Sequence, residues 1–271
     1  SVRCVLPVTR RRKEKHAAAR TPPPLAGEGF RAPLRTMKPA TEPVMDAPAY
    51  PLFLSLRDSR CLVAGFGGVG RRKAAGLLAC DPAALHIFDL HEPEDGEGRA
   101  LLRHKAVRFH TRTCREDDLR PCRLVFAATG SRAENARIAA LCARLGLLCN
   151  CADAPEEGSF LVPASARAGC LTAALSTGGA SPALARRWRG ELETWLAPRA
   201  RTARLMGALR PLILALGEDT RRNTGIFRAL AASSLQDCLE RGDLAACRAL
   251  LEQTLPPALH DRITELLDAV S

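Results

Sequence analysis

The chain has 271 residues, enough for one large or two modest domains with a proper hydrophobic core. No apolar run reaches the ~18 residues that a membrane-spanning helix needs. The net charge of +11 comes with only 4% aromatic residues, and these are not interleaved with a basic stripe. The composition therefore argues against a membrane protein and against a nucleic-acid surface, and suits an anionic small-molecule partner.

Much of the positive charge lies at the start of the chain. Residues 1–46 hold ten Lys/Arg and four Asp/Glu, are rich in Pro and Ala, and show no sustained periodicity. Such a segment cannot bury enough apolar surface to fold alone, so it is predicted to be a disordered N-terminal extension. Met45 is a candidate natural start, and deletion of residues 1–44 is expected to leave folding and activity intact.

The eleven cysteines do not form a recognisable framework. Their number is odd, there is no C-x-x-C, and several lie inside apolar runs as small hydrophobic residues do. The histidines show no spacing typical of metal ligands either. We therefore expect free, mostly buried thiols in a reduced cytoplasmic protein, and no resident metal.

The most informative stretch is a strand–turn–helix signature. A short apolar run, Cys61–Ala64, predicts a strand buried on both faces. G-x-G-x-x-G follows, carried by Gly65, Gly67 and Gly70, and then a helix expected over residues 71–80. In a dinucleotide-binding unit the first glycine permits the tight turn and the second lets the backbone approach the pyrophosphate. The third lets helix and strand pack closely.

A second apolar run, residues 85–88, ends in Asp89, about 20 residues after the motif. A carboxylate there binds both hydroxyls of an unphosphorylated ribose, which favours NAD over NADP. The phosphates would lie at the free N–H groups of the helix start. The alternative is a Gly-rich turn without a ligand. The strand before the motif, the helix after it and the acid at this distance together predict an NAD site.

Further strands are expected at residues 107–110, 124–129 and 147–151, with a loop over 91–98 and helices over 100–104 and 135–145. This alternation predicts an α/β fold with a Rossmann-type, doubly wound parallel sheet over residues 47–155. Thr129 and Gly130 follow a strand on the side where parallel strands face the ligand crevice. They are therefore candidate cofactor contacts.

The second half of the chain reads differently. Paired strands are expected at 159–165 and 171–176, and a helix over 182–196 with Ser181 as its N-cap. These elements form a small α+β region, residues 156–200. An all-helical domain, residues 201–271, follows with breaks near three points: Gly217, Gly242 and Pro256-Pro257. The helix over 182–196 carries an apolar stripe that includes two tryptophans, which predicts core or dimer contact.

Four stretches, taken in their order, resemble the dehydrogenase/ferrochelatase module of siroheme synthases: YPLFLSLRDSRCLVAGFGGVGRRKA, VFAATGSRAEN, CNCADAPEEGSFLVPA and LSTGGASPALAR. The resemblance covers about residues 49–200. It implies NAD-dependent oxidation of precorrin-2 to sirohydrochlorin, in many members followed by insertion of ferrous iron to give siroheme, and a homodimer formed through residues 160–200. Larger relatives add a uroporphyrinogen methyltransferase domain, which these 271 residues are expected to lack.

The resemblance implies the cofactor contacts Gly67, Gly68, Val69, Asp89 and Leu90. It also points to Asp153 as the catalytic carboxylate, with Asn150 in support. A carboxylate at a strand end beside the nicotinamide is suited to take the proton that leaves the macrocycle, and to accept pyrrole protons during chelation. The alternative is that Asp153 only starts an Asp-Ala-Pro turn.

The TGGASP loop is the family's other signature, and its residues Thr177, Gly178, Gly179 and Ser181 are candidate contacts for substrate carboxylates. Arg186, Arg187 and Arg189 follow, either as further carboxylate contacts or as a solvated helix face. The chain departs from the family where two acids commonly stand, at Gly130-Ser131, and at Gly70, where Ala is usual. These departures leave cofactor binding in place and make ferrochelatase activity less certain.

Two other readings use the same scaffold. Another nicotinamide oxidoreductase would keep residues 61–89 but have no need of the Asp-Ala-Pro and TGGASP stretches. A non-catalytic NAD-sensing module would use Asp153 only as a turn residue. Replacement of Asp153 by Ala distinguishes them, because a sensor keeps its ligand response and an enzyme loses turnover.

Overall fold

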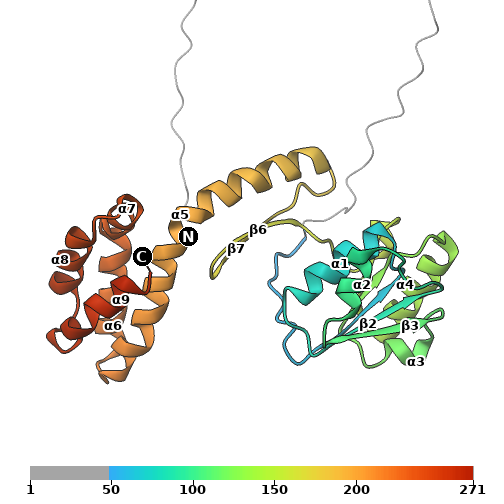
Figure 1. Ribbon diagram of the computed structural model, residues 1–271, viewed down its shortest axis with the longest axis horizontal. Coiled ribbons are helices and arrows are strands. Elements are labelled where there is room, and N and C mark those ends of the chain that lie inside the picture. Colours follow the sequence, from blue (N-terminus) through green and yellow to red (C-terminus); the bar gives the residue numbers. More distant parts are fainter. Residues whose placement is uncertain (1–48, 271) are drawn as a thin grey trace, which may run out of the picture. The chain divides into compact units, whose positions relative to one another are not determined.

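A computed structural model describes residues 49–270, so the predicted N-terminal extension, residues 1–46, lies outside the described residues. The first part is an α/β unit built on a five-stranded sheet in the order β3-β2-β1-β4-β5, with every pair parallel (Figure 1). Its strands are β1 (Arg60–Ala64), β2 (Ala84–Asp89), β3 (Val107–Thr111), β4 (Leu124–Ala127) and β5 (Leu148–Cys151). The predicted Rossmann-type sheet is confirmed.

Helices cover both faces of this sheet. They are α1 (Gly68–Leu78), α2 (Gly96–Leu102), α3 (Glu116–Leu119) and α4 (Arg132–Leu145). Because successive side chains of a strand point to opposite faces, Val63 of β1 packs in the core beneath α1 and α2, whereas its neighbour Leu62 packs with α3 and α4. Both side chains are fully buried, which explains the continuous apolar run in the sequence.

Three helices begin earlier than predicted because polar contacts extend their first turns. The helix expected from Arg71 begins at Gly68, since Arg71 N–H already donates to Gly67 O at 3.0 Å. The helix expected over 100–104 begins at Gly96, inside the predicted loop, because the Asp95 carboxylate accepts from Gly98 N–H at 2.8 Å.

The helix expected from residue 135 likewise begins at Arg132, where the Ser131 hydroxyl accepts from Glu134 N–H. It ends at Gly146 as predicted, with φ of +67°.

After β5 and a short 3₁₀ turn, η1 (Pro155–Glu157), the chain forms an antiparallel hairpin of β6 (Ala164–Ala168) and β7 (Leu171–Leu175). The first strand starts five residues later than predicted. Ser159 and Phe160 instead contact the Rossmann sheet. Ser159 N–H donates to Cys149 O at 2.8 Å, and the ring of Phe160 packs edge-on against Phe126.

The helix predicted over 182–196 is much longer than expected, and α5 runs from Pro182 to Ala215. Its N-cap is Ser181, as predicted. Two prolines, at 198 and 211, lie inside it without ending it. It continues past residue 200 because Leu205, Leu209 and Ile213, all fully buried, pack in the core of the following helices. Tertiary burial therefore outweighs the hydrogen bonds that proline removes.

The chain ends in helices α6 (Thr220–Ala232), α7 (Leu235–Arg241), α8 (Leu244–Thr254), η2 (Pro257–Arg262) and α9 (Ile263–Asp268). The predicted breaks at Gly217, Gly242 and Pro256-Pro257 are confirmed, and these helices share one apolar core with the second half of α5. The first half of α5 packs on the hairpin but leaves Trp188 and Trp195 37% and 54% exposed. They are therefore not part of the chain's own core. Within residues 49–270, no helix is long and apolar enough to cross a membrane.

Candidate functional site

The site is built where β1 and β4 lie side by side, with their helices on opposite faces of the sheet. Parallel sheets of this kind bind ligands at the carboxyl ends of such a strand pair. Gly65 follows β1 with φ of +91°, and a Cβ there would lie 2.2 Å from Ala128 O and 2.6 Å from Thr129 Cα. The first turn of the motif therefore touches the end of β4, and only glycine fits between them.

The glycines of this turn differ in the space around them. At Gly70 a Cβ would lie 1.9 Å from Gly65 O, so this residue allows α1 to pack on the turn, as predicted. At Gly67 and Gly68 a Cβ would meet nothing within 4 Å. These two residues and Val69 are exposed at the start of α1, where helix N–H groups lack intrahelical acceptors. The geometry fits a pyrophosphate approaching the backbone.

Asp89 is the last residue of β2, as predicted, and it binds the motif. One carboxylate oxygen accepts from Phe66 N–H at 2.5 Å, and the other from Leu90 N–H at 2.7 Å and His91 N–H at 3.3 Å. A carboxylate has about four acceptor sites, so one remains for a ribose hydroxyl. Leu90 is 59% exposed beside it.

Arg71 also belongs to this corner, although no role was predicted for it. Its Nε donates to Phe66 O at 3.0 Å, and its guanidinium lies 5.6 Å from the centre of the Phe66 ring and 2.5 Å from an Asp95 oxygen. Arg71 and Asp89 thus hold Phe66 from both sides. The only signal in the sequence was its place directly after Gly70.

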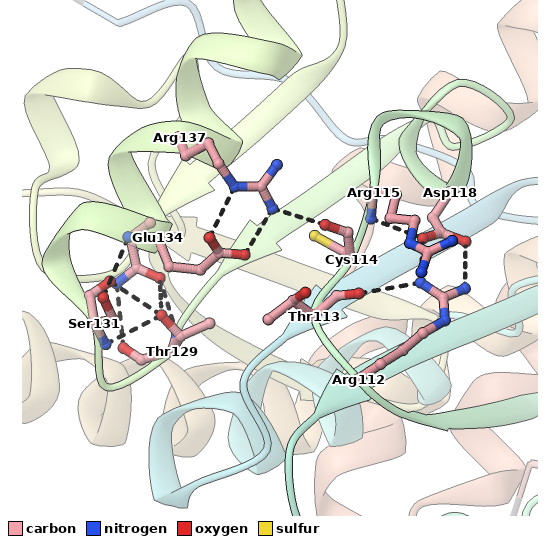
Figure 2. A network of polar contacts seen from close by, with 10 residues as sticks. Arg112, Thr113, Cys114, Arg115, Asp118, Thr129, Ser131, Glu134 and Arg137 are labelled. Atoms are coloured by element: carbon pink, nitrogen blue, oxygen red, sulfur yellow. Dashed lines mark hydrogen bonds and ion pairs between the residues drawn. The ribbon is translucent and has the colours of Figure 1, made fainter.

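A buried amide organises the end of β4. Asn135, 0% exposed, accepts from Thr129 N–H at 2.9 Å and from the Thr129 hydroxyl at 2.7 Å, and donates to Thr129 O at 3.2 Å. Figure 2 shows Thr129 and Ser131 turned toward each other at the start of α4; the Thr129 hydroxyl also contacts Ser131. This turn fixes Thr129 and leaves Gly130 exposed. The sequence did not single out Asn135, because nothing local marks a buried asparagine.

The network around this turn extends across the α4 face. Figure 2 shows Arg137 reaching from Glu134 to the backbone oxygen of Cys114, at 2.7 Å, and a separate fork between Arg112 and Asp118. The Arg137 contact connects α4 to the loop after β3, and the Arg112–Asp118 fork connects that loop to α3. They make the support of the Thr129 turn continuous with the rest of the unit.

Asp153 lies beside Thr129 at the neighbouring strand end. Ala127 of β4 pairs with Cys151 of β5, and Ala152 N–H donates to Ala127 O at 2.9 Å. Thr129 and Asp153 both follow that pair by two residues, so they lie at the ends of adjacent strands. The Cys151 thiol donates to Asp153 Oδ1 at 3.2 Å.

The surroundings favour the ionised form of Asp153. Burial acts to raise the pKa of its carboxyl. Hydrogen bonds from the Asn135 amide and the Cys151 thiol, with the positive charge of Arg132, act in the opposite direction and prevail. The pKa of Asp153 therefore lies below its ordinary value, and the group is a carboxylate at neutral pH.

An ion pair stands next to this carboxylate. Arg132 forms a two-pronged contact with Glu157, in which Nη1 lies 2.8 Å from Oε2 and Nη2 contacts Oε1. Asp153 is close enough to raise the pKa of Arg132 further, after the larger effect of the Glu157 hydrogen bond. Arg132 comes directly after Gly130-Ser131, so the turn that precedes α4 leads straight into this ion pair.

Asn150 and the TGGASP loop have other contacts. Asn150 is buried on the opposite face of β5 from Cys151, and its amide donates to Phe160 O at 3.1 Å. In the loop, Gly178 and Gly179 have φ of +61° and +88°. Amides of the loop and of the helix start already donate to neighbouring loop groups, namely those of Gly178, Ala180, Ser181 and Leu184.

The arginines after that loop are exposed, and two of them pair along the helix, Arg187 with Glu191 and Arg189 with Glu193. Within the described residues, no group of three or more His, Cys, Asp or Glu side chains is placed to hold a metal ion. His86 and His110 do meet, with Nδ1 and Nε2 3.0 Å apart, on neighbouring strands.

Comparison with known proteins agrees with this geometry. Residues 52–164 match the family described as "Putative NAD(P)-binding". The siroheme synthase of Methylococcus capsulatus is 35% identical over 214 residues, which cover 78% of this chain and 44% of that protein. The siroheme synthase of Gluconacetobacter diazotrophicus is 33% identical over 228 residues, covering 82% and 47%. The chain thus spans less than half the length of these relatives.

A solved structure named "SirC, precorrin-2 dehydrogenase" has a similar fold, with a TM-score of 0.58 at 22% identity. The superposition covers 74% of this chain and the whole of that chain. The Rossmann unit described above is an NAD(P)-binding domain.

Proposed function

Because this chain belongs to the siroheme synthase family, as its N-terminal dehydrogenase/ferrochelatase module, we propose that it oxidises precorrin-2 to sirohydrochlorin with NAD. The observation that carries the proposal is the position of Asp153. It is an ionised carboxylate at the end of β5, beside the junction of Gly65 and Thr129 where the cofactor binds.

We assign cofactor contacts to the residues of the glycine turn, of which Gly67, Gly68 and Val69 are exposed, and to the ends of the adjoining strands: Gly65, Gly67, Gly68, Val69, Gly70, Asp89, Leu90, Thr129 and Gly130. The choice of NAD over NADP rests on Asp89, because a carboxylate at the ribose repels a 2′-phosphate. Substrate contacts are proposed for Asn150 and the TGGASP loop, namely Thr177, Gly178, Gly179 and Ser181. Both glycines and Ala180 are exposed at the start of α5.

The reaction removes two electrons and two hydrogen nuclei from the macrocycle. NAD, when bound, accepts the hydride and with it both electrons. The Asp153 carboxylate takes the remaining proton and passes it to solvent, so charge and atoms balance as NADH and a proton. Thr129, fixed by Asn135, holds the end of β4 against Gly65. The nicotinamide side of the site is therefore fixed before the substrate arrives.

Iron insertion is the second proposed activity. Ferrous iron is a substrate there, and Asp153 would accept the two pyrrole protons that the metal displaces, one after the other. The homodimer is proposed through residues 160–200, supported by the exposed Trp188 and Trp195 on the first half of α5. A cytoplasmic location is supported by the ten free thiols between Cys61 and Cys247.

The test is Asp153→Asn, measured anaerobically with precorrin-2 and NAD by the growth of NADH and sirohydrochlorin absorbance. The substitution keeps the shape of the side chain and removes the base. We expect turnover to fall about 10²–10⁴-fold, the usual contribution of a positioned base, while NAD affinity is retained. Glu156→Gln, an exposed carboxylate three residues away, is the matched control and keeps full activity.

Full turnover in Asp153→Asn would contradict the assignment of the base. If the parent protein binds NAD but produces neither NADH nor sirohydrochlorin, the chain is a sensor or another nicotinamide enzyme.

A further inference from the structure

The thiol of Cys151 lies inside the proposed site, in direct contact with its carboxylate. Cys151 is the last residue of β5, 0% exposed, and its Sγ is 3.2 Å from Asp153 Oδ1. Its place is set by the backbone, since Cys151 pairs with Ala127 and the next amide, Ala152 N–H, donates to Ala127 O. The thiol is thus aimed at the carboxylate by the sheet itself.

The thiol stays protonated at neutral pH. Burial first, then the hydrogen bond and the charge of Asp153, raise the pKa of Cys151 to about 11. A protonated thiol donates and does not compete with Asp153 for the substrate's proton. It is also a weak donor, so it orients a carboxylate while lowering its basicity less than a hydroxyl does.

We propose that Cys151 is a positioning residue for Asp153, whose S–H holds Oδ1 so that the other edge of the carboxylate faces the substrate. This inference rests on the proposed function for its catalytic meaning. Its structural content, a hydrogen bond that sets the orientation and basicity of Asp153, stands independently of the substrate.

Other charged and polar groups also act on Asp153, and the proposal has to be separated from them. Arg132 on α4 stabilises the carboxylate, and Glu157 on η1, paired with Arg132, opposes it. The Asn135 amide is a second donor. These three residues stay unchanged in every variant below, so a difference between variants reports on the side chain at position 151.

Simple packing is the competing explanation for a buried thiol, and β5 contains a matched control. Cys149 lies two residues before Cys151 on the same face of the strand, is 2% exposed and belongs to the same apolar core. Its neighbour is the thiol of Cys142. Substitutions at 149 therefore disturb the same core without touching Asp153.

The experiment compares Cys151→Val and Cys151→Ser with Cys149→Val and Cys149→Ser in the full chain. We expect Cys151→Val, which lacks the donor, to lose about tenfold in kcat, the value of one hydrogen bond to a charged group, with the KM for NAD unchanged. The acidic limb of its pH–rate profile should move to higher pH. Cys151→Ser, a stronger donor, should keep kcat and move the limb to lower pH.

A pH titration of the Asp153 carboxyl itself tests the proposal even if the protein shows no turnover. The ¹³C resonance of the Asp153 carboxyl, assigned by its loss in Asp153→Asn, should titrate at higher pH in Cys151→Val and at lower pH in Cys151→Ser. Cys149 variants should leave it in place. If both Cys151 variants titrate like the parent, or if Cys149→Val shifts Asp153 equally, the thiol only fills space and the proposal is wrong. If the Cys151 variants show these shifts relative to the parent but the parent has no turnover, the proposed function is wrong and the role of the thiol stands.

Discussion

Two of the three glycines in helix α1, Gly70 and Gly76, have sharply different surroundings, and replacing each by alanine tests the packing of the cofactor turn. At Gly70 the new Cβ would lie 1.9 Å from Gly65 O and 2.8 Å from Gly65 C, both backbone atoms. At Gly76, two turns further along the same helix, it would meet nothing within 4 Å. The two variants add the same atom to one helix, so their difference isolates the contact.

The sizes of the effects follow from this geometry. A contact of 1.9 Å with backbone cannot be relieved by a side-chain rotation, so the turn or the helix has to shift. Such overpacking costs about 1–3 kcal/mol, and the better helix propensity of Ala offsets up to ~1 kcal/mol of it. Gly70→Ala should therefore lower the free energy of unfolding by about 1–2 kcal/mol, and Gly76→Ala should raise it by up to ~1 kcal/mol. The Tm values should differ by roughly 4–12 °C.

Binding adds a second readout. The displaced atom is Gly65 O, and Gly65 also abuts Thr129, so Gly70→Ala should weaken NAD binding by about tenfold, or ~1.4 kcal/mol. Gly76→Ala should leave it unchanged. Urea unfolding and calorimetric titration with NAD measure the two quantities. Equal stability and equal affinity in both variants would refute the reasoning. They would also show that this turn accommodates alanine at position 70.

Three further predictions concern single side chains. Hydrogen bonding to Arg112 holds the pKa of Asp118 at about 2, below the ordinary 3.8, so its stabilisation is complete above pH ~4 and lost as the pH falls toward 2. Acid unfolding followed by circular dichroism should show Asp118→Asn lacking about 1–2 kcal/mol of that pH dependence. Burial lowers the pKa of both His86 and His110 from 6.5, so the fold favours neutral rings and loses stability as the pH falls below about 6.5. His110→Gln should flatten this slope in melts between pH 7 and 5, and an unchanged slope would exclude the pair as its source. Asp89→Asn should weaken NAD binding about tenfold and reduce the preference over NADP, measured by parallel titrations.

The parts of the fold that could be predicted are those with local causes. The parallel strands are buried on both faces, so each appears as a short apolar run, as at Leu62 and Val63. The glycine motif has fixed spacing because Gly65 and Gly70 each face backbone atoms. Helix ends at Gly146 and Gly242 follow from left-handed residues that glycine adopts readily.

What could not be predicted depends on contacts distant in sequence. The second half of α5 is helical through Pro198 because Leu205 enters a core made by later helices. Residues 159–163 do not extend the hairpin because Phe160 packs on Phe126 of the sheet. The contact of Asn135 with Thr129 is short in sequence, six residues apart, but it depends on how the turn before α4 folds. Such pairs leave no periodic signal.

The cysteines affect whether unfolding of this protein is reversible. Of the ten thiols described, eight are buried in the native state, where oxidants and other thiols do not reach them. Global unfolding exposes all of them to one another and to oxidants. In air, non-native disulfides that form in the unfolded chain block its refolding and make unfolding irreversible. The lifetime of the protein outside a reducing medium is therefore governed by its unfolding rate, and a thiol reductant should restore reversibility.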